Sequence, residues 1–459
     1  MSNRIVNINL TQTVAPTPSA LQQTGAFISQ GGTTLTPGTM SYLTQLSDLA
    51  AITKPAAANA SLAWATSTVT VTTASPHGLA TSTAAWVTIA GVTPSAYNGT
   101  FLVTATGTTT FTYTLATNPG TETVAGTWAP QSVNELAQMA SSFFAMGSDT
   151  GVYVLELGFA TNVTNIATLS TWLANNPATV YAFLTPRTWD GLPAFTALAL
   201  SYSGTTAKTY FLATTTNATY SNYTSLMKSV MTFIESPAAT ALEFQAAAML
   251  QEILGYNPSS TNKVTPLAFS YLYGATPYPA TGNATLFTAW KAAGVNWVGL
   301  GSEGGVNLAI LLWGTTADGR PFNYWYAADW MQINIDLNIS NAVMNGSNNP
   351  INPLGLDQNG INRLQAVGAS TISSGVAFGM VLGQVVQTEL AAVPFLTALE
   401  TGAFAGQAVI NAIPFLSYYR ASPGDYKAGV YNGFSVTFTP LRGFASITFN
   451  VNVTDFVSQ

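Results

Sequence analysis

Residues 152–184 have the sequence VYVLELGFATNVTNIATLSTWLANNPATVYAFL, and this stretch decides the fold class. Val152–Leu157 and Thr179–Leu184, at its two ends, are short apolar runs with the length of buried strands. Between them, Val163–Leu173 carries apolar residues at helical spacing. A strand, a helix and a second strand in this order predict a parallel or mixed sheet covered by helices.

Strand and helix patterns continue to alternate on both sides of this stretch. Upstream, Ser132–Ala145 begins with a capping serine and predicts a helix. Downstream, the apolar spacing predicts a helix at Ala194–Tyr202, a strand at Thr209–Ala213, a helix marked by Leu226, Val230, Phe233 and Ile234, helices at Leu242–Leu254 and Thr285–Ala292, and a strand at Asn296–Leu300. Two strands at Leu308–Trp313 and Phe322–Tyr326 would flank an Asp-Gly hairpin turn, followed by helices at Ala328–Met344 and at Gln358–Val367, the latter with Asp357 as N-cap.

Residues Ser61–Trp128 differ in composition from the rest of the chain. They are rich in Thr, Val, Ala and Gly and contain no Lys or Arg. Short strand patterns separated by turn residues occur at Thr68–Thr73, Trp86–Ala90, Thr100–Thr104, Thr110–Leu115 and Glu122–Trp128. This spacing predicts a small all-β sandwich or barrel inserted into the α/β (α+β) core.

Both ends of the chain have the period-2 alternation of half-buried strands. At the N-terminus the apolar positions are Val6, Ile8 and Leu10, and a Pro-containing linker, Thr13–Ala20, follows them. The C-terminal strands form a predicted hairpin around Pro440–Gly443, with apolar positions Phe434, Val436 and Phe438, then Ile447, Phe449, Val451 and Val453.

A lone N-terminal strand cannot satisfy its own backbone, so it must join a sheet. If that sheet belongs to another subunit, the contact is strand addition between chains. The alternative is pairing within its own chain, and the pattern alone favours neither. The apolar positions of the terminal strands are therefore candidates for contacts between subunits.

Composition excludes several classes of function. The chain has 459 residues, 12 Lys+Arg, 18 Asp+Glu, one His, no Cys and a net charge of −6. It therefore has no basic surface for nucleic acid, no thiol chemistry and, with His77 alone, no His-based metal cluster or Ser–His triad. We expect no membrane span, because no apolar run reaches about 18 residues, and no secretory signal, because the N-terminal MSNRIVNINLTQT has no hydrophobic core. The acidic residues form no recognisable catalytic pair, so we expect no catalytic residue, metal or cofactor.

The order of these elements resembles the contractile tail sheath proteins of myophages, in particular a sheath-like group long treated as a family of unknown function. The resemblance rests on the terminal strand arms and on Ser132-Val-Asn-Glu-Leu…Phe143-Phe144 leading into Val152-Tyr-Val-Leu. The inserted segment is similar to the small β modules of phage virion proteins, through Thr68-Val-Thr-Val, Pro76-His-Gly-Leu, Ala96-Tyr-Asn-Gly-Thr-Phe and Phe111-Thr-Tyr.

This resemblance implies a structural subunit, not an enzyme, which polymerises into stacked helical rings around a tail tube and contracts to drive the tube through the host envelope. Its partners would be further copies of itself, the tail tube protein, and baseplate and tail terminator proteins, with no nucleic acid and no membrane. It would be assembled in the host cytoplasm and reside in the virion tail. The expected organisation is an N-terminal arm and linker (1–24), a sheath core (25–60 and 129–430), an inserted β module (61–128) and a C-terminal hairpin and strand arm (431–459).

Two other functions remain open at this point. The chain could be another virion protein, from the tube, capsid or baseplate, although a tube protein would have less strand and helix alternation. It could also be a glycan-binding surface protein that uses the inserted module. That module has aromatic residues at Trp64, Trp86, Tyr97 and Tyr113, most of which the alternation assigns to its core.

Overall fold

The structure is a computed structural model and describes residues 20–79, 84–147, 149–223, 225–240, 242–279, 282–303 and 306–443. The chain divides into two compact units, and one boundary between them falls between Tyr326 and Ala327, within helix α7 (Phe322–Ser347). The α/β unit consists of Leu21–Asn257 and Val264–Tyr326 together with the described residues that follow Leu441, and the C-terminal unit consists of Pro258–Lys263 and Ala327–Leu441.

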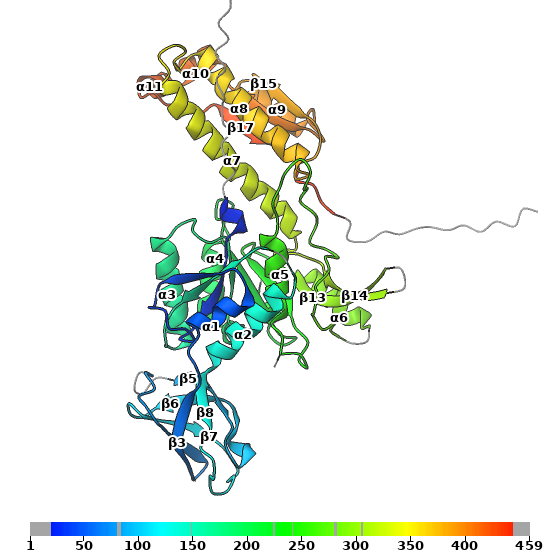
Figure 1. Cartoon of the computed structure of the whole chain (residues 1–459). Coiled ribbons are helices and arrows are strands. Elements are labelled where there is room, and N and C mark those ends of the chain that lie inside the picture. Colours follow the sequence, from blue (N-terminus) through cyan, green and yellow to red (C-terminus); the bar gives the residue numbers. More distant parts are fainter. Residues whose placement is uncertain are drawn as a thin grey trace, which may run out of the picture. The chain divides into compact units, whose positions relative to one another are not determined.

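An eight-stranded mixed sheet forms the centre of the α/β unit, with the strand order β14-β13-β12-β11-β10-β1-β9-β2. Figure 1 labels β13 and β14 of this sheet, with α6 beside them. All neighbouring pairs from β9 to β13 are parallel, whereas β2 and β14 are antiparallel to their neighbours. The strands are β1 (Gly25–Ser29), β2 (Met40–Leu43), β9 (Val152–Glu156), β10 (Ala182–Leu184), β11 (Tyr210–Thr215), β12 (Val230–Ile234), β13 (Val295–Glu303) and β14 (Val306–Leu312).

Helices cover both faces of this sheet. On one face Ala26 and Ile28 of β1 belong to a buried cluster with residues of α3 and α4. On the other face Phe27 meets Phe143 of α2 edge to face, with 5.6 Å between ring centroids. The helices of this unit are α1 (Leu49–Ile52), α2 (Gln131–Phe144), α3 (Asn162–Asn175), α4 (Pro193–Ser201), α5 (Gln245–Leu254) and α6 (Ala284–Ala292), with 3₁₀ turns at Ala20–Gln23, Leu46–Asp48, Ser95–Tyr97, Arg187–Trp189 and Tyr220–Asn222. The predicted mixed, helix-covered sheet is confirmed.

Several local predictions are wrong. The strand predicted at Glu122–Trp128 shares only its last two residues with the observed strand Thr127–Pro130, and Ser132 does not cap its helix, which begins at Gln131. The helix predicted around Val230 is strand β12, whose five residues are all buried. A strand buried on both faces is apolar throughout, and so short a run cannot be told from a helix by its spacing. The strand predicted at Phe322–Tyr326 is the beginning of helix α7, in which the rings of Phe322 and Tyr326, four residues apart, lie 6.2 Å from each other.

The predicted inserted β module is a closed barrel with the strand order β3-β4-β7-β6-β5-β8, antiparallel throughout. Its strands are β3 (Ala57–Ala65), β4 (Thr68–Thr73), β5 (Ala84–Ala90), β6 (Gly99–Ala105), β7 (Thr110–Thr114) and β8 (Thr127–Pro130), of which β3 was not predicted as a strand. Val69, Val71, Val103 and Phe111 fill the interior with no exposure. His77 is a buried part of this fold, because its Nδ1 accepts a hydrogen bond from the amide of Leu79 at 2.9 Å.

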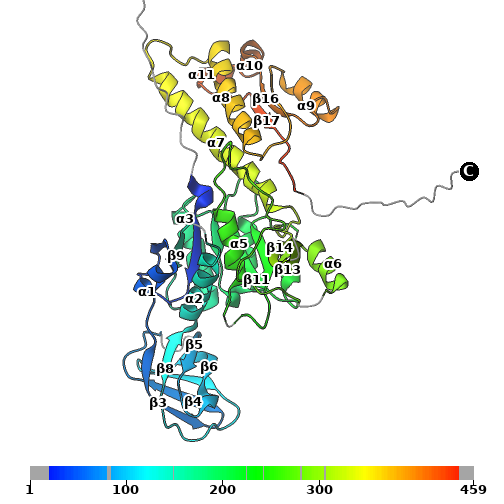
Figure 2. The same ribbon diagram turned by 45° about the vertical axis from the view of Figure 1, so that its right-hand side comes forward.

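The C-terminal unit contains a three-stranded sheet with the order β15-β16-β17 (Figure 2). Strands β15 (Val385–Thr388) and β16 (Ala408–Ala412) are parallel and are connected through α9 (Ala392–Glu400), while β17 (Phe434–Thr437) is antiparallel to β16. The remaining helices are α7 (Phe322–Ser347), α8 (Gln358–Ala377), α10 (Phe415–Ala421) and α11 (Pro423–Lys427). The predicted cap of α8 is confirmed, since the Asp357 side chain accepts a hydrogen bond from the amide of Gly360. No helix in the described part of the chain is both long and apolar enough to cross a membrane.

Candidate functional site

The described residues include three of the predicted contact positions. Phe434 and Val436 lie on β17, and Phe438 follows directly after it. The side chains of these three residues are half-buried, whereas Ser435, Thr437 and Thr439 between them are exposed. The remaining predicted positions, Val6, Ile8, Leu10, Ile447, Phe449, Val451 and Val453, lie outside the described residues.

Strand β17 presents an unpaired backbone edge. It pairs with β16 in the register Ile410↔Val436, and the amide of Ile413 donates to the carbonyl of Gly433 at 3.0 Å. In an antiparallel ladder, hydrogen-bonded pairs alternate with pairs that do not bond to each other. Phe434 and Val436 therefore direct their backbone N–H and C=O groups away from β16, and no strand of the described residues pairs with that edge.

Within the described ranges, strand β15 pairs with no strand other than β16, so its outer edge, on the other side of the same sheet, is also open. The amide of Ala408 donates to the carbonyl of Gln384 at 2.9 Å, which sets the direction of the parallel ladder. By the same alternation, Val385 and Gln387 direct their backbone groups away from β16. Such edges are templates for strand pairing with another chain unless they are covered.

Buried side chains hold this sheet rigid at one end. Gln365 of α8 donates through Nε2 to the carbonyls of Thr388 at 2.8 Å and Ile410 at 3.0 Å. The Asn411 amide exchanges two hydrogen bonds with the backbone of Leu390, at 2.8 and 2.9 Å. Because these polar groups are buried and paired, the register of β15 against β16 is fixed, and the two open edges keep a defined spacing.

A second polar cluster, in the α/β unit, was not signalled by the sequence. Arg187 Nε lies 2.8 Å from Glu235 Oε2, its Nη1 donates to Gln138 Oε1 at 2.7 Å, and its guanidinium stacks on Phe244 with 4.1 Å to the ring centroid. Glu135 also approaches this cluster. Burial raises the pKa of the Glu135 carboxyl to about 7, although Arg187 opposes the change. Burial likewise raises the pKa of Glu235, again against the effect of Arg187.

No group of three His, Cys, Asp or Glu residues within the described ranges could hold a metal ion. Glu243 holds a loop in place, because its carboxylate accepts hydrogen bonds from the backbone amide of Thr276 at 2.9 Å and from the Thr276 hydroxyl at 2.6 Å. Glu235 forms the ion pair with Arg187, and the backbone carbonyl of Glu243 also accepts a hydrogen bond from this guanidinium.

The fold of this chain is similar to that of several solved structures, whereas its sequence gives no match. No known protein-family model matches the sequence, and no curated protein matches it either. Among solved structures, a chain of the anti-feeding prophage (AFP) baseplate aligns with a TM-score of 0.53 and 11% identity, over 99% of this chain and 100% of that one.

Two further solved structures align with the chain. A chain of the AFP helical sheath in the contracted state has a TM-score of 0.50 and 11% identity, over 98% of this chain and 99% of that one. The sheath tail protein of Desulfitobacterium hafniense aligns less well, with a TM-score of 0.38 and 12% identity over 82% of this chain and 90% of that one, and nothing is inferred from it. The chain therefore has the fold of the contractile tail sheath, as the resemblance in its sequence implied.

Proposed function

We propose that this chain is the structural subunit of a contractile tail sheath, which polymerises around a tail tube by exchanging strands between copies. The observation that carries the proposal is the open-edged sheet β15-β16-β17 in a chain with the sheath fold. The likeness in fold spans nearly the whole length of both chains, so it includes this sheet and is not limited to the barrel.

The terminal strands are the proposed occupants of the open edges. A strand containing Val6, Ile8 and Leu10, or one containing Ile447, Phe449 and Val451, would add to the sheet of a neighbouring copy. Each interchain hydrogen bond contributes about 1 kcal/mol net, and the apolar alternate side chains add about 25 cal/mol per Å² buried. Several such bonds per joint would make the polymer durable.

In this proposal, contraction occurs when the subunits rotate while the strands exchanged between them stay paired. The linker Thr13–Ala20 contains two prolines and no long apolar residue other than Val14, so it can change its path without unfolding a core. Rigid subunits could then turn relative to one another without separating. In this proposal the extended sheath is held by a kinetic barrier and contracts downhill without nucleotide or cofactor.

The proposed partners are the tail tube inside the sheath, and baseplate and terminator proteins at its two ends. The fold likeness to a chain of the AFP baseplate and to one of the AFP sheath supports an assembly of this kind. The proposed location is the virion tail, after assembly in the host cytoplasm. The terminal arms, the inserted module and the sheath core would act as the separate parts expected from the sequence.

Electron microscopy of purified protein tests strand exchange directly. The full-length chain is expected to form regular tubes, and a variant lacking Met1–Thr11 is expected to stay folded as single subunits. Regular tubes formed equally well by both proteins would contradict the proposal. Far-ultraviolet circular dichroism of the truncated protein distinguishes a failure to assemble from a failure to fold.

A substitution at the sheet edge gives a sharper test. Val436→Pro removes an N–H that points to the open edge and leaves the ladder to β16 intact, which proline tolerates at an edge strand. We expect a folded protein that no longer forms tubes. The matched control Val436→Thr keeps that N–H and the strand propensity, and should assemble. If Val436→Pro assembles as readily as Val436→Thr, this edge is not a joint between copies.

A further inference from the structure

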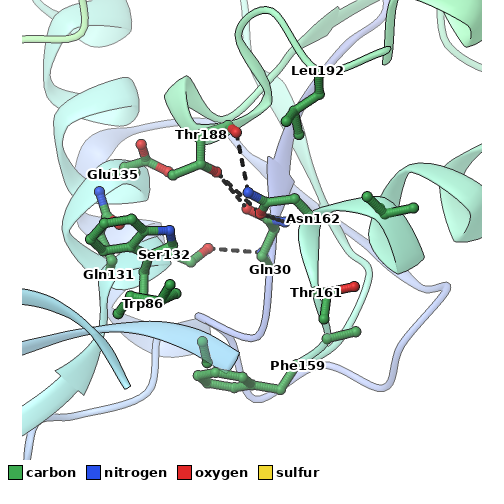
Figure 3. Close-up of a pocket in the computed structure, with 14 residues that line it drawn as sticks. Gln30, Trp86, Gln131, Ser132, Glu135, Phe159, Thr161, Asn162, Thr188 and Leu192 are labelled. Atoms are coloured by element: carbon green, nitrogen blue, oxygen red, sulfur yellow. Dashed lines mark hydrogen bonds between the residues drawn. The ribbon is translucent and has the colours of Figure 1, made fainter. Parts of the chain in front are cut away.

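A pocket of about 300 Å³ lies in the α/β unit beside the barrel (Figure 3). The barrel contributes Trp86 of β5 and Leu102 of β6, while Gln131 begins α2 and Thr161 and Asn162 begin α3. In Figure 3 the indole of Trp86 lies on one side of the pocket, and Thr161 and Asn162 lie on the other. A concave site with a few converging polar groups is the usual form of a small-ligand site.

Trp86 is an exposed aromatic residue in a barrel that buries most of its others. Its neighbours Ala85 and Val87 point into the barrel and are buried, so alternation along β5 places Trp86 outside. It is 40% exposed and pairs across the strands with Leu102, which is 52% exposed. The side chains of Trp86 and Leu102 together form an exposed apolar surface on the outside of the barrel, separate from its buried core.

The opposite side of the pocket combines apolar side chains, among them Phe159, Val163 and Leu192, with amide and hydroxyl groups that hold one another in place. Gln30 Nε2 donates to Asn162 Oδ1 at 3.0 Å, and Asn162 Nδ2 donates to the carbonyl of Thr188 at 3.1 Å. Two further groups remain available, because neither the Trp86 indole nor the Gln131 amide forms a hydrogen bond with any described residue. The pocket thus offers one fixed polar wall and free donors beside the aromatic face.

The lining carries almost no charge. None of the described residues that line the pocket is Lys or Arg, and Glu135 is the only one with a carboxyl group. Glu135 is 5% exposed, and its Oε1 has no hydrogen-bond partner among the described residues. Its raised pKa, about 7 through burial, leaves much of this carboxyl uncharged near neutral pH. An anionic ligand would find no counter-charge here, and a cationic one would find at most a partial charge.

We propose that this pocket binds a neutral saccharide, with one sugar ring stacked on Trp86 and its hydroxyls bonded to Gln131 and to the amide wall. Sugars present apolar C–H faces and a rim of hydroxyls, and the pocket pairs an aromatic face with uncharged amides. A pocket of about 300 Å³ is at the lower end of small-ligand sites, which suits one or two rings better than a folded segment of another protein. The proposal does not depend on the sheath function.

A glycan array probed with the labelled full-length chain tests this inference. The array should carry neutral hexose and N-acetylhexosamine oligosaccharides beside sialylated and sulfated ones, and calorimetry with the strongest neutral glycan gives the affinity. We expect binding to neutral glycans only. Trp86→Ala should weaken it at least about tenfold, and Trp86→Phe, which keeps an aromatic face, should weaken it less.

Control variants distinguish the loss of the binding site from the loss of the folded structure. Tyr273→Ala removes another exposed aromatic, 54% exposed and outside the pocket, and should bind as the unchanged protein does. Gln131→Ala alters a helix-start side chain without touching the barrel and should weaken binding by about threefold, because one hydrogen bond is lost. Trp86→Ala should still form tubes, so failure of this proposal and failure of the sheath proposal are distinguishable.

Three outcomes would overturn the inference. The first is the absence of any neutral glycan bound by the unchanged protein at millimolar concentration. The second is binding confined to acidic glycans. The third is equal affinity of the Trp86→Ala variant and the unchanged protein. If Trp86→Ala instead abolishes tube formation while no glycan binds, the pocket holds a segment of a neighbouring copy and the saccharide assignment is wrong.

Discussion

We expect the buried carboxyl of Glu135 to make the stability of the α/β unit depend on pH. Glu135 lies on α2, and its carboxyl is buried near Arg187. One of its two oxygens has no hydrogen-bond partner among the described residues. Replacing it by glutamine keeps the size of the side chain and removes the charge at every pH. Glu135→Gln is therefore expected to stabilise the protein at alkaline pH and to change little at acidic pH.

The size of this effect follows from the pKa. Burial raises the pKa of Glu135 from 4.5 to about 7. At about 1.4 kcal/mol per pKa unit, the difference corresponds to about 3 kcal/mol. Because the folded pKa lies above the unfolded one, this stability is fully present below about pH 4.5 and is lost as the pH rises through about 7. At pH 8 we thus expect Glu135→Gln to raise the free energy of unfolding by up to about 3 kcal/mol.

Amide hydrogen exchange of peptides from α2, measured between pH 4 and pH 8 and corrected for intrinsic exchange rates, gives the local free energy of opening. Glu235 also has a pKa raised by burial, and its charge contributes to raising the pKa of Glu135, so the difference between the two proteins measures Glu135 together with its coupling to Glu235. As a control, Glu400→Gln alters an exposed carboxylate and should change stability by less than about 0.5 kcal/mol. Parallel pH profiles for the variant and the unchanged protein would refute the reasoning.

Three other substitutions test the packing of the two units, each through its free energy of unfolding in urea. Arg187→Met leaves Glu235 buried without its ion-pair partner and should cost about 3–5 kcal/mol, so a loss below about 1 kcal/mol would contradict the role given to this ion pair. Asp357→Ala removes the N-cap of α8 and should cost about 1 kcal/mol, and no loss would mean that water caps the helix equally well. Gly383→Ala places a Cβ at a φ of +90° against the carbonyl of Gly406 and should cost more than Gly406→Ala, where φ is +71° but the space is open; equal costs would refute the clash.

Local patterns were sufficient for much of the fold. The barrel strand Thr68–Thr73 and the cap at Asp357 were predicted where the structure has them, because alternation and capping depend on neighbours a few residues away. The strand β12 could not be predicted in the same way. Its five buried residues have no alternation, since it lies between β11 and β13 with helices on both faces of the sheet.

The candidate sites depend on the tertiary structure even more than the strands and helices do. The alternation of Phe434 and Val436 predicts a strand, but whether its edge is open depends on β16, which comes earlier in the chain and pairs with its other side. The pattern of the inserted module indicates that most of its aromatic residues are core, and Tyr97 and Tyr113 are indeed buried. Trp86 is the exception, because its side chain is exposed outside the barrel. It has polar neighbours only because the beginnings of α2 and α3 lie beside the barrel in the folded unit.

The sequence by itself determined most of the strand and helix elements, the inserted barrel and the absence of thiol or His-cluster chemistry, because composition and short-range periodicity carry that information. Only the tertiary structure decided which backbone edges stay unpaired, that Glu135 and Glu235 share one arginine, and that Trp86 faces a pocket. These properties arise from contacts between segments that are distant in the chain, and such contacts are set by the packing of the whole fold.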